Sequence, residues 1–477
     1  MPRSSPVHCA AVDLGATSGR VIVGTWTGRK LGLTEVHRFA NRFDSIGTHD
    51  YWNLPGLWAE IVTGLRAAKQ RFPRLASVGV DTWGVDHVLL GDRGRLVFPA
   101  HAYRDARTQR GLQRLSHTRA TLDRIYAATG VPDVFYNTSL QLEETVASCP
   151  AVTDLASRCL LLPDYFNFLL SGRAENEISI ASTTQLLDVH GRDWSRAALA
   201  HFHVPPGWFT PPIKAGTVLG PVRSVPELAG VKVVAVPGHD TACAYDAMPA
   251  DPAGGDLYIS SGTWSLVGFE SDQPVLGAGA LAARISNERT GDGRYRPLRN
   301  VIGLWLLEQT LREFSARPRN DREWSALIAA AARLPAPAKL LDVTDPAFVN
   351  PRSMRAAIDA QLKRRKLRPP GNLAGYTRLI CASLGQGHAD ALDAFERLAG
   401  RKFRRILIVG GGSRNGLLCQ ATADASGRPV HAFTLEGAAT GNIAAQLIGL
   451  RAGRDLAEIR GVIGRQIKAV VYSPQAR

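Results

Sequence analysis

The fold of this chain is decided by Asp13-Leu14-Gly15-Ala16-Thr17-Ser18-Gly19-Arg20, which lies between two apolar, β-branched runs, Ala10-Ala11-Val12 and Val21-Ile22-Val23. This pattern predicts a strand, a glycine turn and a second strand. Because glycine has no side chain, backbone amides in such a turn can approach a polyphosphate closely. The hydroxyls of Thr17 and Ser18 add hydrogen-bond donors beside them. The stretch is therefore a candidate phosphate-binding turn.

Two further glycine-rich segments occur later in the chain. Ser260-Ser261-Gly262-Thr263-Trp264-Ser265 lies between Leu257-Tyr258-Ile259 and Leu266-Val267-Gly268, which predicts a second strand, turn and strand. Gly410-Gly411-Gly412-Ser413 follows the apolar run 405–409. Two phosphate turns could hold one nucleotide from two sides. Neither of the first two turns is a Walker-type loop, because that loop needs a Gly-Lys-Ser/Thr ending and a following helix.

The spacing of the first two turns predicts the domain organisation. They lie roughly half of the 477-residue chain apart, which predicts two related lobes with a cleft between them. Strand and helix patterns alternate in both halves, so the predicted fold class is α/β. The boundary is expected in 249–255, which is rich in Pro, Gly and Asp. The predicted lobes are therefore residues 1–248 and 249–477.

Hydrophobic periodicity also predicts individual elements. Strands are expected at 78–81, 88–90, 231–236 and 405–409, and helices at 57–72, 160–170, 304–314, 374–398 and 416–425.

The composition bears on the partners of the protein. The formal net charge is +15, but the 57 Lys and Arg residues are spread along the whole chain. The dense run Lys363-Arg364-Arg365-Lys366 is followed by Pro369-Pro370-Gly371, as at a solvated helix end. The sequence lacks an RNA-binding aromatic signature, a helix-turn-helix pattern and a zinc finger. We interpret the charge as a solvated surface that attracts anionic nucleotide or sugar phosphate, without a nucleic-acid partner.

Apolar runs and cysteines bear on the cellular location. The apolar runs are too short to span a bilayer, and Met1-Pro2-Arg3-Ser4-Ser5-Pro6 lacks the apolar stretch of a signal peptide. A cytoplasmic protein without membrane association is therefore expected. The six cysteines are scattered and form no Cys-x-x-Cys pair, which indicates buried thiols rather than a zinc site or disulfides. A monomer and a homodimer are both compatible with the sequence.

The candidate chemistry is carried by carboxylates near the ends of predicted strands. Gly238-His239-Asp240-Thr241 follows one such strand. A hydroxyl is a poor nucleophile at neutral pH, so phosphoryl transfer needs a carboxylate within reach of the attacking oxygen, a role that fits Asp240. Asp13, directly before the first turn, is placed to hold Mg²⁺, which favours few carboxylates plus phosphate oxygens. Asp81-Thr82-Trp83-Gly84-Val85-Asp86 supplies the polar groups and aromatic face that a sugar site commonly uses.

Together these motifs closely resemble those of the FGGY carbohydrate kinases. The matching segments, in family order, are Asp13-Leu14-Gly15 with Ser18-Gly19-Arg20, Asp81 to Asp86, Tyr103-Arg104-Asp105, Gly238 to Thr241, Ser260 to Trp264, and Gly410 to Ser413. The resemblance covers nearly the whole chain and is strongest to the members that phosphorylate L-rhamnulose, in segments such as Tyr51-Trp52-Asn53 and Ala423-Asp424-Ala425. It implies two actin-like, ribonuclease-H-type lobes that bind ATP, Mg²⁺ and a small-molecule sugar, with transfer to the 1-hydroxyl of L-rhamnulose.

Matching positions imply roles for individual residues. Lobe 1–248 would carry the sugar site, the first phosphate turn and the catalytic aspartate, and lobe 249–477 the second phosphate turn and the adenosine site. Contacts to ATP are implied for Ala16, Thr17, Ser18, Gly19 and Arg20 at the phosphates, Thr263 near the γ-phosphate, Gly411 at the adenosine and Glu308 near the nucleotide. Contacts to the sugar are implied for Gly84, His239, Asp240, Thr241 and Asn300, with Asp240 as the base.

The chain also departs from the family pattern. Glu308 stands where the family commonly has Gln, His87 replaces an aromatic residue, and Arg414 replaces a Gln of the third turn. Gly385-Gln386-Gly387 is expected to interrupt the helix predicted at 374–398. These departures concern nucleotide affinity and sugar preference, and they leave Asp240 in place.

Other functions remain compatible with these residues. One is an FGGY kinase for another ketose, a deoxy sugar or a polyol, such as L-fuculose, xylulose, ribulose or glycerol. A more distant one is a non-catalytic actin-like nucleotide-binding protein, for which sugar-independent ATP hydrolysis would be the sign. A nucleic-acid binder, recognisable by steeply salt-dependent DNA binding, comes last.

Overall fold

The computed structural model describes residues 5–475 except 110, 115, 116, 316 and 350. The chain forms two compact units, and each takes up several segments of the sequence. The first unit consists of Met1–Pro249, Glu270–Pro297 and Gly437–Gln466, and the second of Ala250–Phe269, Leu298–Glu436 and Ile467–Arg477. The division into functional lobes at 248 and 249 stays a prediction.

A six-stranded sheet forms the centre of the first unit. Its strand order is β3 (Leu31–Ala40), β2 (Ser18–Trp26), β1 (Val7–Leu14), β6 (Leu75–Thr82), β10 (Lys232–Val234) and β9 (Val218–Pro221). β1 is antiparallel to β2 and parallel to β6, and β10 is parallel to β6. The predicted strand, glycine turn and strand around Gly15 is therefore confirmed.

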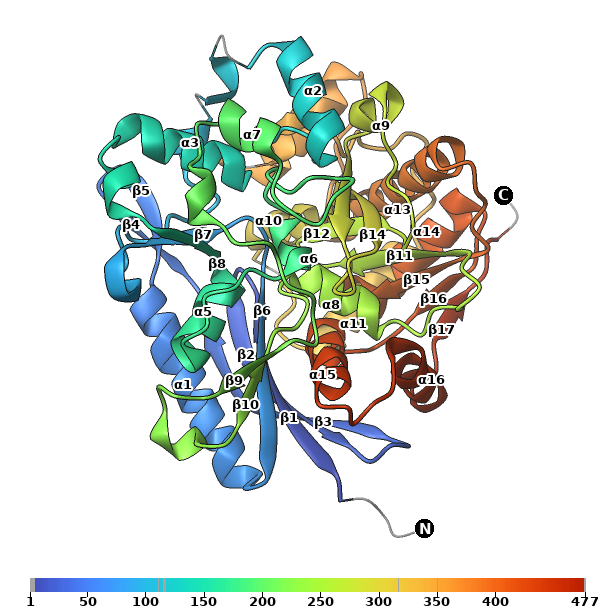
Figure 1. The fold of residues 1–477 in the computed structure, drawn as a ribbon. Coiled ribbons are helices and arrows are strands. Elements are labelled where there is room, and N and C mark those ends of the chain that lie inside the picture. The colour runs from blue at the N-terminus through green and yellow to red at the C-terminus, as the bar shows by residue number, and fades with distance from the viewer. Residues whose placement is uncertain (1–4, 110, 115–116, 316, 350, 476–477) are drawn as a thin grey trace. The chain divides into compact units, whose positions relative to one another are not determined.

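The two faces of this sheet are covered by different helices because its strands alternate their side chains. On one face, Val78 and Val80 belong to a hydrophobic core that also contains residues of α1 (Leu54–Arg71) and α5 (Leu162–Ser171). On the other face, α15 (Gly437–Gly449) lies against β1 and β6, and Figure 1 shows α1 and α15 on opposite sides of these strands. A Cβ atom on Gly79 would lie 2.9 Å from the side-chain oxygen of Asn442, so this close approach requires glycine.

The remaining elements of the first unit surround this sheet. Four of the remaining strands form two antiparallel two-stranded sheets, β4 with β5 and β7 with β8, while β13 (Ile285–Arg289) lies beside the start of β14. Their bounds are β4 Phe43–Ile46, β5 His49–Trp52, β7 His87–Leu90 and β8 Arg158–Leu161. The other helices are α2 (Arg119–Thr129), α3 (Thr138–Ser148), α4 (Val152–Leu155), α6 (Ile178–Ala181), α7 (Arg196–His201), α8 (Asp240–Ala247), α9 (Ala278–Ala282) and α16 (Leu456–Gln466).

The second unit is built on a sheet with the same type of hairpin. The strand order is β13, β14 (Tyr295–Ile302), β12 (Trp264–Gly268), β11 (Asp256–Ser261), β15 (Arg405–Val409), β16 (Val430–Ala432) and β17 (Val470–Tyr472), with β13 and the first three residues of β14 counted in the first unit. β11 is antiparallel to β12 and parallel to β15. The predicted strand, turn and strand around Gly262 is thus confirmed as well.

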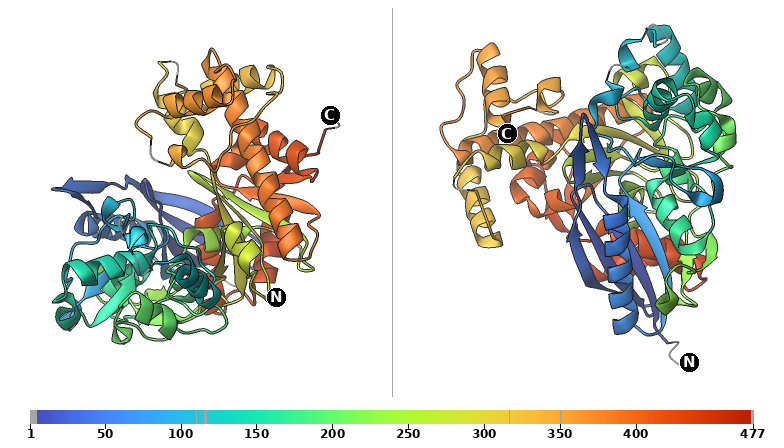
Figure 2. Two further views of the ribbon diagram at one scale, coloured as in Figure 1. Left: turned by 90° about the horizontal axis from the view of Figure 1, so that it is seen from above. Right: turned by 90° about the vertical axis from the view of Figure 1, so that its left-hand side faces the viewer.

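Helices flank this second sheet. Their bounds are α10 Trp305–Arg312, α11 Asp321–Ala332, α12 Met354–Arg364, α13 Leu373–Leu398 and α14 Gly416–Ser426. α13 packs against α14 and also contacts α10 and α11. In both views of Figure 2, α11 and α12, yellow to orange, gather with the start of α13 into a helical group. Among the described helices, none is both long and apolar enough to cross a membrane.

The expected interruption of the helix at 374–398 is wrong. α13 runs without a break from Leu373 to Leu398, through Gly385 and Gly387. A Cβ atom on Gly385 would lie 2.6 Å from the backbone carbon of Ala421 in α14, and one on Gly387 would lie 2.9 Å from Val343. These glycines therefore allow close packing of the helix, and the packing energy outweighs their low helix propensity.

Two other predicted elements differ at their ends. The helix expected at 160–170 begins at Leu162, because 158–161 form β8, which pairs with β7. The strand expected at 231–236 is limited to Lys232–Val234. The helices predicted at 57–72 and 416–425 correspond closely to α1 and α14, and the strand at 405–409 to β15.

Candidate functional site

Three aspartates meet at one edge of the first unit's sheet. Asp13 lies near the end of β1 and is paired in register with Asp81 of the parallel strand β6. The amide of Thr82, directly after Asp81, donates to the carbonyl of Gly238 over 2.9 Å, which brings the segment after β10 to the same edge. Because parallel strands share the edge at which they end, Asp240 lies in the same region, and its charge acts on Asp81.

The first glycine turn connects β1 and β2 at this edge. The amide of Gly15 donates to the carbonyl of Ser18 over 2.9 Å, and the amide of Asn41 donates to the carbonyl of Thr17 over 3.0 Å. A Cβ atom on Gly19 would overlap the ring of Phe39, so only glycine fits there. Thr17 is exposed, and Ala16 and Ser18 are half-buried. The turn thus presents its tip to solvent, as a phosphate-binding turn must.

Asp13 is the residue predicted to hold Mg²⁺. Its Oδ2 accepts a 2.5 Å hydrogen bond from Nη2 of Arg20, which lies opposite it in the hairpin. Among the described residues, no group of three or more His, Cys, Asp or Glu side chains is arranged to hold a metal ion. A single carboxylate together with phosphate oxygens and water is, however, a donor set that suits Mg²⁺. Asp13 therefore fits the predicted Mg²⁺ site. Arg20 would compete with the ion for the carboxylate of Asp13.

Asp81 is completely buried, which its sequence position did not reveal. Its Oδ2 accepts a 2.6 Å hydrogen bond from Asn442 of α15, whereas its Oδ1 has no hydrogen-bond partner among the described residues. Burial and then the nearby charge of Asp13 raise the pKa of Asp81 well above its usual value. Asp81 is therefore a buried carboxyl group on the strand beside Asp13, and its burial argues against a direct contact with a sugar.

Asp240, the predicted base, is the first residue of α8. Its side chain is 33% exposed, in contrast to the buried Asp81. The hydroxyl of Thr241 donates to Oδ1 of Asp240 over 3.1 Å, and Nε2 of His239 lies 3.5 Å from the same oxygen. Asp240 is thus a partly exposed carboxyl group at the start of α8, accessible to a substrate hydroxyl as a general base must be.

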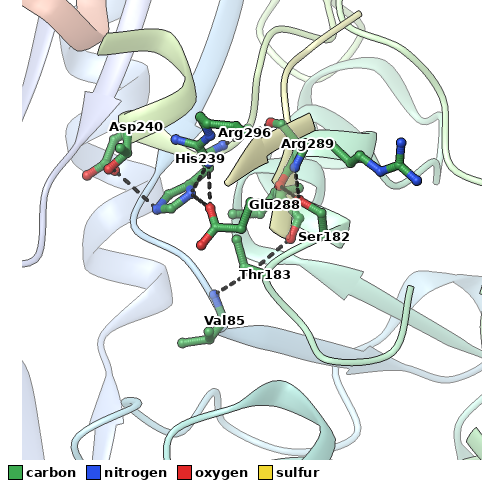
Figure 3. A network of polar contacts seen from close by, with 12 residues as sticks. Val85, Ser182, Thr183, His239, Asp240, Glu288, Arg289 and Arg296 are labelled. Atoms are coloured by element: carbon green, nitrogen blue, oxygen red, sulfur yellow. Dashed lines mark hydrogen bonds and ion pairs between the residues drawn. The ribbon is translucent and has the colours of Figure 1, made fainter. Parts of the chain in front are cut away.

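His239 belongs to a buried charged network that the sequence did not predict. Its Nδ1 lies 2.9 Å from Oε2 of Glu288, and Nη2 of Arg296 lies 2.5 Å from the same oxygen. Figure 3 shows the His239 ring between the carboxylates of Asp240 and Glu288, with Arg296 beside it. Burial alone would raise the pKa of Glu288, but the charge of Arg296 and the hydrogen bond with His239 hold it below its usual value. A sequence signal for this pair existed: opposite charges in strand patterns on either side of the turn Gly291-Asp292-Gly293.

The loop at Gly84 is held in a strained conformation. Val85 has a φ of 69°, a left-handed value that a β-branched residue rarely adopts. Its amide donates to Oγ1 of Thr183 over 3.2 Å, and its carbonyl accepts a 2.6 Å hydrogen bond from Thr138. A Cβ atom on Gly84 would lie 3.4 Å from Thr183 and 3.5 Å from Nε2 of His239. The strain therefore places Gly84 in front of the His239 ring, and such strain is typical of functional sites.

Trp83 and Asp86 flank this loop but point into the protein. The indole nitrogens of Trp52 and Trp83 donate to Oδ2 of Asp86 over 2.6 and 2.7 Å. Burial raises the pKa of Asp86 to about 6, partly offset by the hydrogen bond from Trp83. Within the segment Asp81 to Asp86, Gly84 alone is partly exposed, whereas Trp83 and Asp86 shape the loop from the interior. The sugar contact of Gly84 stays a prediction.

In the second unit, the second and third glycine turns lie together. β11 and β15 are parallel neighbours, and Ser260 is paired with Val409, so both turns follow at the same edge. Gly410 has a φ of 84°, and a Cβ atom on it would lie 2.6 Å from the carbonyl oxygen of Ser261. A Cβ atom on Gly412 would overlap the hydroxyl of Ser261. Glycine is required at both positions because the two turns touch.

The predicted nucleotide residues of the second unit surround these turns. The amide of Gly303 donates to the carbonyl of Thr263 over 3.1 Å, which brings the start of α10 to the second turn. A Cβ atom on Gly411 would lie 3.7 Å from Leu304 at that start. Glu308, in the first turn of α10, is exposed, and Asn300 is exposed on β14, opposite Leu266. Thr263, Gly411 and the start of α10 thus form one region.

Two departures from the family pattern have structural partners. His87 is buried beside a small cavity of about 20 Å³, and burial followed by the charge of Arg107 lowers the pKa of His87 to about 3. The imidazole is therefore neutral at neutral pH. Arg414 lies 3.7 Å from Glu436, an exposed pair that contributes little to stability.

Comparison with known proteins shows the family of this chain. Residues 9–245 match the N-terminal domain of the FGGY family of carbohydrate kinases, and residues 257–450 match its C-terminal domain. The chain belongs to the FGGY family of carbohydrate kinases. This FGGY kinase is 40% identical over 472 residues to a rhamnulokinase of Klebsiella pneumoniae subsp. pneumoniae, an alignment that covers 98% of this chain and 94% of that protein.

Solved structures confirm the fold of the FGGY kinase. A gluconate kinase of Lactobacillus acidophilus matches 99% of this chain and 94% of its own with a TM-score of 0.79 at 15% identity. A ligand-bound xylulose kinase of the same organism matches 98% of this chain and 94% of its own, also with a TM-score of 0.79 at 15% identity. The predicted α/β, actin-like fold is therefore confirmed, and the protein is an ATP-dependent carbohydrate kinase.

Proposed function

We propose that this FGGY kinase transfers the γ-phosphoryl group of ATP to the 1-hydroxyl of L-rhamnulose, which gives L-rhamnulose 1-phosphate and ADP. The observation that carries the catalytic part is Asp240, a partly exposed carboxylate at a helix N-terminus beside the His239 ring. The sugar is proposed from the identity to the Klebsiella rhamnulokinase over nearly the whole chain. The proposed use of ATP as a co-substrate is compatible with a cytoplasmic enzyme, which is the location expected from the sequence.

The proposed contacts to the sugar and the nucleotide use the residues implied by the family resemblance. For the sugar these are Gly84, His239, Asp240, Thr241 and Asn300. For ATP they are Ala16, Thr17, Ser18, Gly19 and Arg20 of the first turn, and Thr263, Glu308 and Gly411 of the second unit. Asp13 would hold Mg²⁺, which, when bound, neutralises charge on the phosphate oxygens.

In the proposed reaction, Asp240 accepts the proton of the sugar hydroxyl. The hydroxyl oxygen forms a bond to the γ-phosphorus while the bond from that phosphorus to the bridging oxygen of ADP breaks. Amides of the first turn and the side chain of Thr263 stabilise the charge on the transferring group. The bound sugar displaces water from Asp240, so the γ-phosphoryl group is transferred to the sugar hydroxyl rather than to water.

A substrate panel tests this proposal. ADP release is measured with Mg²⁺-ATP against L-rhamnulose, L-fuculose, L-ribulose, D-xylulose, D-ribulose and glycerol, with a blank that lacks sugar. L-rhamnulose should give the highest kcat/KM. A higher value for another sugar would overturn the substrate and keep the catalytic roles, whereas equal ADP release in the blank would contradict sugar-dependent transfer.

Substitution tests the proposed base. Asp240→Asn preserves size but cannot accept a proton, so turnover should fall about a hundredfold or more. Thr263→Ala is the matched comparison, because it should mainly raise the KM for ATP. A folded Asp240→Asn protein with turnover near that of the wild type would remove Asp240 from the mechanism.

A further inference from the structure

The buried network behind His239 has a composition that stability alone does not explain. The side chain of Arg296 is completely buried, and its Nε and Nη1 have no hydrogen-bond partner among the described residues. Glu288 is buried as well, with a side chain 8% exposed. Burying two charges costs several kcal/mol per ion, and a buried ion pair is often no more stabilising than an apolar pair of the same size. The contacts of this pair therefore bear on its role.

What the pair contacts is the His239 ring. Oε2 of Glu288 lies 2.5 Å from Nη2 of Arg296 and 2.9 Å from Nδ1 of His239, so one oxygen accepts from both. Nη2 of Arg296 also lies within hydrogen-bond distance of Nδ1, at 2.9 Å, and a guanidinium nitrogen can only donate. His239 also occupies the N-cap position of α8, yet its ring is turned to Glu288. The ring orientation is thus set by Glu288, and Glu288 is set by Arg296.

This geometry also fixes the position of a proton on the ring. Nδ1 lies between the carboxylate of Glu288, which can only accept, and the guanidinium of Arg296, which can only donate. The contact of Nη2 with Oε2 of Glu288, at 2.5 Å, is shorter than its contact with Nδ1, so the Arg296 hydrogen is directed to the carboxylate and Nδ1 is left to donate to Glu288. Nε2 then faces the space in front of Gly84, where a Cβ atom would lie 3.5 Å away. Its 3.5 Å separation from Oδ1 of Asp240 is longer than a normal hydrogen bond, so this contact does not place a hydrogen on Nε2. A histidine whose Nδ1 donates to a buried carboxylate and whose Nε2 faces the reacting group is the arrangement that orients a histidine in hydrolytic triads.

We propose that Glu288 and Arg296 are positioning residues of this kinase: they hold the His239 ring with Nδ1 protonated and present Nε2 to Asp240 and to the sugar hydroxyl. The inference rests on the proposed function, since it assigns these residues to the sugar side of the same site. They act through His239 and do not touch the substrate. β13 and the start of β14, which carry them, thereby contribute to catalysis from a segment outside the family motifs.

The first test determines which nitrogen of the His239 ring carries the hydrogen. Nitrogen-15 NMR of the histidine rings distinguishes a protonated Nδ1 from a protonated Nε2, and the signals of His239 are those lost in His239→Gln. The wild type should show Nδ1 protonated, and Glu288→Gln should lose this preference, because an amide can donate to Nδ1 as well as accept. A wild type with Nδ1 unprotonated, or an unchanged ring in Glu288→Gln, would overturn the proposal.

The second test is kinetic. Glu288→Gln should lower kcat about 10- to 100-fold, the loss typical of removing the partner that orients a functional histidine, and should leave the KM for ATP within about twofold. Arg296→Lys keeps the positive charge, so its kcat should fall less than that of Arg296→Met. The matched control is Glu143→Gln, because Glu143 is also a buried carboxylate, 2.8 Å from Nε2 of His117. An equal loss of kcat in Glu143→Gln would contradict the proposal.

A folding defect can be separated from a positioning defect. Glu288→Gln leaves Arg296 buried without its partner, which costs stability. The double variant Glu288→Gln with Arg296→Met removes both charges and should fold, yet kcat should stay low. Recovery of wild-type kcat in the double variant would show a purely structural role. If the wild type phosphorylates none of the sugars, the proposed function fails, while the NMR reading still decides the role of Glu288.

Discussion

Gly84 shows how a missing side chain shapes the proposed sugar site. The strained backbone at Val85 brings Gly84 to Thr183 and to the imidazole of His239. The buried carboxylate of Asp86 fixes the loop by accepting from the indole of Trp83 over 2.7 Å. The hydrogen bonds and packing around the loop thus hold a conformation that Val85 would otherwise avoid.

This arrangement predicts the effect of a single methyl group. In Gly84→Ala, the new Cβ atom would lie 3.4 Å from Thr183, an ordinary contact, so folding should be little affected. The methyl group would nevertheless fill the space in front of Nε2 of His239. We expect the KM for the sugar to rise about tenfold, by analogy with a misfit of one methyl group in a pocket, while the KM for ATP stays constant.

Steady-state kinetics and a thermal midpoint measured on the same preparation separate the two effects. Gly32→Ala, on β3 with no atom near the new Cβ, serves as the control. An unchanged KM for the sugar in Gly84→Ala would place the sugar elsewhere.

Glu177 illustrates a buried acid that supports the catalytic segment. It caps α6, and its Oε2 also accepts a 2.9 Å hydrogen bond from the amide of Gly238, next to His239. Burial raises the pKa of Glu177 to about 7, partly offset by this hydrogen bond from Gly238. The side chain therefore ties the loop before Asp240 to α6 through backbone contacts.

At the scale of elements, the two units share the same arrangement of a hairpin and a parallel strand. In each unit an antiparallel hairpin, β1 with β2 or β11 with β12, is followed in the sheet by a parallel strand, β6 or β15. The glycine turns and the segments after the parallel strands therefore reach the same edge. This explains why Asp13 meets Asp81, and why Ser261 meets Gly410, although each pair is far apart in the sequence.

Helix packing in the second unit supplies a prediction at this scale. Gly385→Ala places a Cβ atom 2.6 Å from the backbone of Ala421, so α13 must move away from α14. Overpacking of this kind costs about 1–3 kcal/mol and exceeds the gain of about 1 kcal/mol from replacing glycine in a helix. We expect a lower thermal midpoint, by a few degrees.

The control for Gly385→Ala is the same substitution at a helix position where a new Cβ atom has room. Gly461 lies within α16, where the nearest atom to a new Cβ is a side-chain nitrogen of Arg465 at 3.5 Å. Gly461→Ala should therefore raise the thermal midpoint slightly. A midpoint for Gly385→Ala at or above that of the wild type would contradict the packing explanation.

At the scale of the whole molecule, each compact unit carries part of the proposed chemistry. The first unit holds the first turn, Asp13, Gly84 and Asp240, and the second holds the other two turns. Both units also contain segments that are distant in the sequence. Residues 437–466 return to the first unit, where α15 covers the sheet and donates from Asn442 to Asp81.

Hydrogen exchange of the whole protein tests this division of labour. Mg²⁺-ATP should slow amide exchange in 261–263 and in Gly411–Arg414, whereas L-rhamnulose should slow it in 82–86 and 238–241. The physical reason is that a bound ligand lowers the population of locally opened states around its contacts. The exchange is measured by mass spectrometry of peptides from protein incubated with one ligand at a time. Protection by the sugar confined to the second unit would contradict the proposed residues.

Local sequence patterns were sufficient to predict individual elements and the chemistry tied to them. Glycine between β-branched runs specifies a hairpin at Gly15 and at Gly262, because turn geometry depends on a few neighbouring residues. Asp240 could be proposed for the same reason, since it follows a strand and a glycine within one short segment. The family and the kinase activity also followed from such motifs, and the comparisons confirm both.

Only the tertiary structure decided what depends on distant residues. Asp81 looked like a site residue and is buried by α15, Gly385 looked like a helix breaker and packs against α14, and Glu288 with Arg296 showed only opposite charges on either side of a turn. Burial, the sharing of one carboxylate oxygen and the close approach of two helices are properties of surfaces brought together by folding. A local pattern records the propensity of its own residues and carries no information on which partner they will meet.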